Sequence, residues 1–121
     1  MKIETIDDIN SVLPYRDRLE VLAEEASELT QAALKVIRAG NMSENPTPMS
    51  YDLARESLDE EIVDVLVALS ALGFDCGIFN VESYKGVDGF KMMREAKVKR
   101  WCKRISDKIQ EDALWKSGKK S

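Results

Sequence analysis

The chain has 121 residues, a formal net charge of −4 and no histidine. Its length suits one domain with a real core, and no apolar run reaches the roughly 18 residues of a membrane-spanning helix. The absence of histidine excludes histidine general bases, histidine-activated nucleophiles and metal sites with imidazole ligands.

The remaining bulk features favour a cytoplasmic protein. Cys76 and Cys102 lie too far apart for a CxxC metal or redox site, so we expect reduced thiols. The N-terminal stretch MKIETIDDIN lacks the basic and apolar regions of a secretory signal.

The first half of the chain predicts two helices. A short helix near residues 4–13 ends at Pro14, since proline disfavours helical geometry in the residue before it. A second helix runs from about 15 to 38 and stops at Gly40, which we interpret as a left-handed cap. The segment GNMSENPTPMS, residues 40–50, is rich in helix breakers and predicts a loop.

The second half predicts two more helices and no strand. One starts after Ser50, a good N-cap, and reaches about Gly73. A turn, FDCGIFN, precedes the last helix at roughly 88–112, and residues 113–121 are expected to form a flexible tail. The expected fold is therefore an all-α bundle of four helices in a single domain, residues 1–121.

Two helices carry the same acidic pattern. Residues 22–34 read LAEEASELTQAAL and residues 58–70 read LDEEIVDVLVALS. At about 100° per residue, each helix has one apolar stripe. The stripe residues are Leu22, Ala26, Leu29, Ala33 and Val36 on one helix, and Leu58, Ile62, Val65, Leu69 and Leu72 on the other. Four acids lie on the shoulders of these stripes: Glu25, Glu28, Glu61 and Asp64. The neighbouring acids Glu24 and Glu60 turn towards solvent.

The spacing brings the two acidic pairs together. Both pairs are equally far from the centre of the 40–50 loop, so an antiparallel hairpin sets them at the same height. Half-buried carboxylates need compensating charge, and the only basic residue on the second of these helices is Arg55. A hard cation held by oxygens, Mg²⁺ or also Mn²⁺, is the predicted compensator. The alternative is that the acids are simply a solvated helix face.

At this point the chain resembles the MazG-like all-α nucleoside triphosphate pyrophosphohydrolases, whose signature is E-x-x-E followed by E-x-x-D. The matching stretches are EEASE, residues 24–28, and EEIVD, residues 60–64. The resemblance implies a four-helix MazG-like bundle in which Mg²⁺ is bound by the catalytic acids Glu25, Glu28, Glu61 and Asp64. It implies hydrolysis of a nucleoside triphosphate, ribo or deoxyribo, to the monophosphate and pyrophosphate.

The C-terminal segment suggests how phosphates would bind. Residues 85–121 hold 12 basic and 5 acidic side chains, against 6 basic and 17 acidic side chains in residues 1–84. By the resemblance, Lys97, Arg100 and Arg104 are predicted to contact substrate phosphates. A solvated basic face is the alternative, and Trp101 either stacks on a base or, as we favour, belongs to the core.

We also expect a homodimer or homotetramer. Val63 and Val67 lie away from the apolar stripe of their helix, so that helix is apolar almost all round. A short N-terminal helix and a basic C-terminal helix are not expected to cover this surface, whereas a second subunit would. The resemblance also implies oligomers of such helices.

Two other classes compete with the enzyme. One is a non-catalytic helical module that oligomerises or regulates, and the other is a nucleic-acid-binding helical protein. The acidic first part of the chain opposes the second, because it repels phosphate backbones. No feature selects the nucleobase or the sugar, or favours the related substrate phosphoribosyl-ATP.

Overall fold

A computed structural model of the chain describes residues 2–40, 44, 49–74 and 89–118. These residues form four helices and no strand, which confirms the all-α prediction for this part of the chain. The helices are α1 (Ile6–Val12), α2 (Tyr15–Ala39), α3 (Tyr51–Ser70) and α4 (Gly89–Gly118).

Local chemistry marks the starts of the first three helices, and the predicted N-cap at Ser50 is confirmed. Thr5 and Asp8 form a capping box at α1, in which each side chain accepts a hydrogen bond from the backbone of the other residue. Pro14 precedes α2, and the Ser50 hydroxyl accepts a hydrogen bond from the backbone N–H of Leu53 at 3.2 Å.

The helix ends differ in part from the sequence predictions. Gly40 has a φ of −86°, so the predicted left-handed cap at the end of α2 is wrong. That conformation occurs instead at Gly73, with a φ of +92°. There the N–H of Phe74 reaches the carbonyl of Leu69, which is a Schellman end that favours glycine. Helix α4 continues to Gly118, beyond the predicted end near residue 112.

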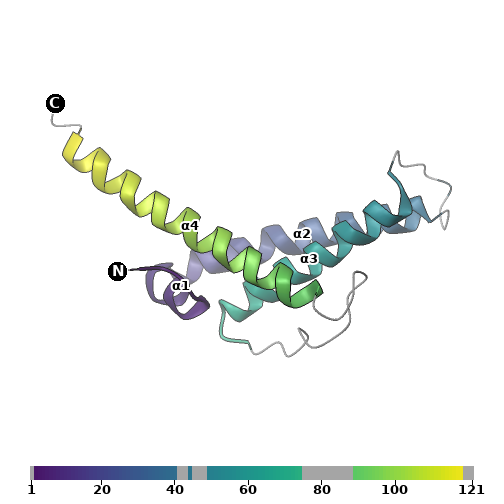
Figure 1. Ribbon diagram of the computed structural model, residues 1–121, viewed down its shortest axis with the longest axis horizontal. Coiled ribbons are helices and arrows are strands. Elements are labelled where there is room, and N and C mark those ends of the chain that lie inside the picture. The colour runs from purple at the N-terminus through teal and green to yellow at the C-terminus, as the bar shows by residue number, and fades with distance from the viewer. Residues whose placement is uncertain (1, 41–43, 45–48, 75–88, 119–121) are drawn as a thin grey trace.

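The helices α2 and α3 form a long antiparallel hairpin, and α4 crosses α3 (Figure 1). Helix α1 lies beside α4, whose C-terminal end projects away from the hairpin. The Arg18 guanidinium donates to the carbonyls of Leu13 and Ala71, at 3.0 and 2.8 Å, and so fastens the start of α2 to the end of α3.

The core lies between α1, α3 and α4. Its largest fully buried members are Ile9, Val63 and Val67, and α4 adds Trp101, which confirms the core interpretation of this side chain. The expectation that Val63 and Val67 would be left uncovered by their own chain is therefore wrong. Both valines are buried in a cluster to which α1 and α4 contribute apolar side chains. Helix α4 can do this because it carries an apolar stripe in addition to its basic residues.

The hairpin interface is rotated relative to the predicted stripes. On α2 the most buried residues are Glu25, Ala32 and Val36, whereas Ala26 is exposed. The predicted stripe of α3, with Leu58 at its centre, is only half-buried. Glu25 thus lies inside the interface rather than on its shoulder.

Apolar side chains remain exposed towards the loop end of the hairpin, which extends beyond α4 (Figure 1). They are Leu34, Ile37, Tyr51 and Leu53, between 39 % and 55 % exposed. The homo-oligomer itself stays a prediction.

None of the helices in the described ranges combines the length and the apolar composition that crossing a membrane requires. Residues 75–80 of the predicted turn, including Cys76, and most of the 40–50 loop lie outside the described residues.

Replacing Val67 by alanine should lower the free energy of unfolding by about 2 kcal/mol, since buried methyl groups are lost and a cavity remains. Leu53→Ala, at a position on α3 that is 55 % exposed, is the control and should change it by less than about 0.5 kcal/mol. Urea denaturation measures both variants. Equal effects would contradict the burial of Val67 within one chain.

Candidate metal centre

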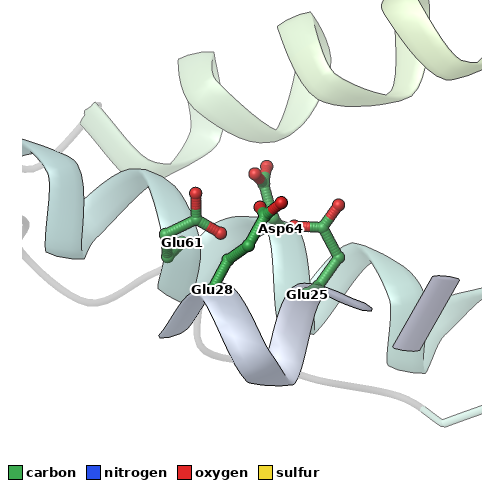
Figure 2. A group of neighbouring side chains, drawn as sticks. All are labelled: Glu25, Glu28, Glu61 and Asp64. Carbon is green, nitrogen blue, oxygen red and sulfur yellow. The ribbon is translucent and has the colours of Figure 1, made fainter. Parts of the chain in front are cut away.

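The α2–α3 hairpin brings the two acidic pairs together. Residues three apart on a helix share a face, so Glu25 and Glu28 point from α2 to the side on which α3 presents Glu61 and Asp64. Figure 2 shows the four side chains converging between the helices, below α4. One carboxylate oxygen from each residue lies within 4.8 Å of the others. The predicted convergence is therefore confirmed.

The four acids differ in exposure. Glu25 is buried, at 9 % exposed, Glu61 and Asp64 are half-buried, and Glu28 is exposed. The buried alanines Ala32 and Ala68 lie one helical turn beyond Glu28 and Asp64 on their helices. Because Glu25 is buried and Glu28 is exposed, solvent reaches the cluster from the side of Glu28.

A lysine from α4 enters the cluster. The Lys97 ammonium lies 3.1 Å from Glu25 Oε1 and 3.8 Å from Asp64 Oδ1, and the residue is only 7 % exposed. The inference that only a metal cation compensates the acids is therefore wrong, because α4 supplies a basic partner from outside the two hairpin helices. Lys97 does have a sequence signal, because it falls at helical spacing between the core residues Phe90 and Trp101.

One ammonium leaves most of the negative charge uncompensated. Burial, together with the charges of Asp64, Glu28 and Glu25, raises the pKa of Glu61 from its ordinary 4.5 to about 7. Burial also raises the pKa of Asp64 from 3.8 to about 6, against the lowering effect of Lys97. These shifts show that the cluster disfavours its own ionised form.

Two carboxylate oxygens of the cluster are left without a partner in the described part of the chain. Glu25 Oε2 and Glu61 Oε2 are buried and have no hydrogen-bond partner among the described residues. Buried carboxylate oxygens without partners are costly. The donor set consists of oxygen atoms alone, which suits a hard divalent cation such as Mg²⁺. The residues therefore fit such an ion.

The other predicted phosphate contacts lie on α4 near the cluster. A surface cavity of about 420 Å³ adjoins it, lined by Glu60, Asp64, Met92, Met93, Ala96 and Arg100. The positive charge of Arg100 lowers the pKa of Asp64, which is consistent with this position. Arg104 is exposed one turn farther along α4 and does not line the cavity. The larger cavity, about 910 Å³ between α1 and α4, includes none of the four acids.

The chain has no significant match among protein-family models, curated proteins or solved structures.

Magnesium at millimolar concentration should raise the melting temperature by several degrees, because a ligand that binds only the folded state stabilises it. Glu28→Gln, which removes an exposed carboxylate of the cluster, should weaken this response. Glu24→Gln, an exposed acid beside the cluster, is the control and should keep it. A melting temperature that does not change with Mg²⁺, together with no heat of binding by calorimetry, would contradict a metal site at these residues.

The raised pKa of Glu61 predicts a pH-dependent stability in metal-free buffer. Between pH 4.5 and about 7 the folded protein keeps a proton on Glu61 that the unfolded chain has released, so stability falls as the pH rises through this window. Glu61→Gln removes this loss. The variant should therefore melt at the wild-type temperature at pH 4 and above it at pH 8. A constant difference across this range would contradict the shifted pKa.

Proposed function

We propose that the chain is a Mg²⁺-dependent nucleoside triphosphate pyrophosphohydrolase, which converts a ribo- or deoxyribonucleoside triphosphate to the monophosphate and pyrophosphate. The observation that carries the proposal is the convergence of four carboxylates, with two buried oxygens that lack hydrogen bonds. The resemblance of EEASE and EEIVD to the MazG-like signature supports the same reaction.

Glu25, Glu28, Glu61 and Asp64 are the proposed ligands. A bound Mg²⁺ would neutralise charge on the triphosphate and favour in-line attack at phosphorus. The chain's own contribution is to hold these carboxylates in one cluster and to orient a water molecule with one of them. That carboxylate accepts a proton as the water oxygen bonds to the α-phosphorus. The bond from this phosphorus to the bridging oxygen breaks, and pyrophosphate leaves.

The cavity beside Asp64 is the proposed position of the polyphosphate. Arg100 lines it, and Arg104 presents a second guanidinium on the next turn of α4. Guanidinium groups suit phosphate oxygens, because their donors match the geometry of two oxygens at once. Lys97, from the same helix, is proposed to join them once it is released from the carboxylates. Met92 and Met93 add a polarisable apolar wall.

A second candidate is a non-catalytic helical module with the same fold. The observation that favours it is the Lys97 ion pair, which supplies part of the compensating charge without any metal. Such a protein would bind neither Mg²⁺ nor nucleotide. The pyrophosphohydrolase is favoured because one ammonium does not satisfy the oxygens of four carboxylates.

A pyrophosphate-release screen over common and modified ribo- and deoxyribonucleoside triphosphates, with Mg²⁺, tests the proposal. Wild-type protein should release pyrophosphate from at least one of them. Glu61→Gln should lose more than about 100-fold in rate, since even outer-shell partners of a metal contribute 10- to 100-fold. Its circular dichroism should remain helical.

The control for this experiment is Glu24→Gln, which should keep the wild-type rate. A Glu61→Gln protein with wild-type turnover would contradict the assigned role of Glu61. No release from any triphosphate, together with no Mg²⁺ binding, would favour the non-catalytic module.

A further inference from the structure

Lys97 occupies an unusual position for a lysine. It is 93 % buried, and its ammonium is held between Glu25 on α2 and Asp64 on α3, although it belongs to α4. A buried ammonium is costly unless it is paired. Both of its partners belong to the set of four carboxylates that fits a divalent cation.

The positions of Lys97 and of such a cation compete. An ion held by the four carboxylates would share oxygens of Glu25 and Asp64 with the ammonium, which lies 3.1 Å from Glu25 Oε1. Like charges a few ångströms apart repel strongly in a partly buried site. The ammonium and the metal ion are therefore not expected to bind the same carboxylate oxygens at the same time.

One partner of Lys97 also borders a cavity. Asp64 belongs both to the ion pair and to the 420 Å³ cavity, which is also lined by Ala96 and Arg100 from the same helix as Lys97. A lysine has a flexible four-carbon stem, so its ammonium moves by rotation about side-chain bonds alone.

We infer that Lys97 is the resident cation of the carboxylate cluster and that it competes with the divalent metal for Glu25 and Asp64. It is a positioning residue: it holds the two helices' carboxylates together without metal and is displaced when metal binds. This inference rests on the proposed metal site, whose regulation it describes. It also explains how a chain can hold four converging acids before any ion arrives.

The test compares Lys97→Met, which keeps the length of the side chain and removes its charge, with wild-type protein. Lys99→Met, at an exposed lysine of α4 that lines the other cavity, is the matched control. Calorimetry with Mg²⁺ alone measures affinity, and thermal unfolding in EDTA measures metal-free stability. Lys97→Met should bind Mg²⁺ about tenfold more tightly, equivalent to about 1.4 kcal/mol, and melt at a lower temperature in EDTA. Lys99→Met should match wild type in both.

The outcomes separate this inference from the proposed function. Unchanged or weaker Mg²⁺ binding by Lys97→Met, beside normal binding by wild type, would overturn the competition and leave the metal site intact. No binding by either protein would overturn both. Tighter binding by the variant, with no pyrophosphate release by wild type, would support the competition and overturn the enzyme. If Lys97→Met does not fold, Lys97→Gln, which keeps a hydrogen-bond donor, takes its place in the same titration.

Discussion

The balance of charge inside the α2–α3 hairpin is the constraint on which the rest of the structure depends. Four carboxylates have oxygens within 4.8 Å of one another, in an interface that also buries alanine and valine side chains. Mutual repulsion and desolvation both oppose this arrangement. The shifted pKa values of Glu61 and Asp64 record that opposition, and the ammonium of Lys97 offsets part of it.

The position of α4 follows from this constraint and from the core. Phe90, Val98, Trp101, Cys102 and Ile105 pack α4 against α1 and α3. With this stripe seated, the helical repeat sets Lys97 against the acids and leaves Arg100 at the edge of the adjoining cavity. A single helix thus contributes core, counter-charge and the proposed phosphate contacts. Lys97 lies on the same buried face of α4 as Phe90 and Trp101, whereas Arg100 and Arg104 are exposed.

Much of the fold follows from local signals. Pro14 marks the end of one helix and Ser50 the start of another through backbone chemistry that acts within one turn, and both predictions are confirmed. The left-handed cap predicted at Gly40 is absent, because a glycine permits that conformation without requiring it. The acidic pairs were also predictable. Their common spacing from one loop fixes their height in any antiparallel hairpin, whatever the details of packing.

The sequence by itself determined the four helices, the hairpin and the convergence of Glu25, Glu28, Glu61 and Asp64, since these depend on helical periodicity and on distance from a loop. Only the tertiary structure decided which face of each helix is buried and which basic side chain contacts the four acids. Val63 and Val67 are covered by α1 and α4, and Lys97 reaches Glu25 from 72 residues away. Such contacts depend on how α4 docks, and no periodicity within one helix specifies the rotation of another helix against it.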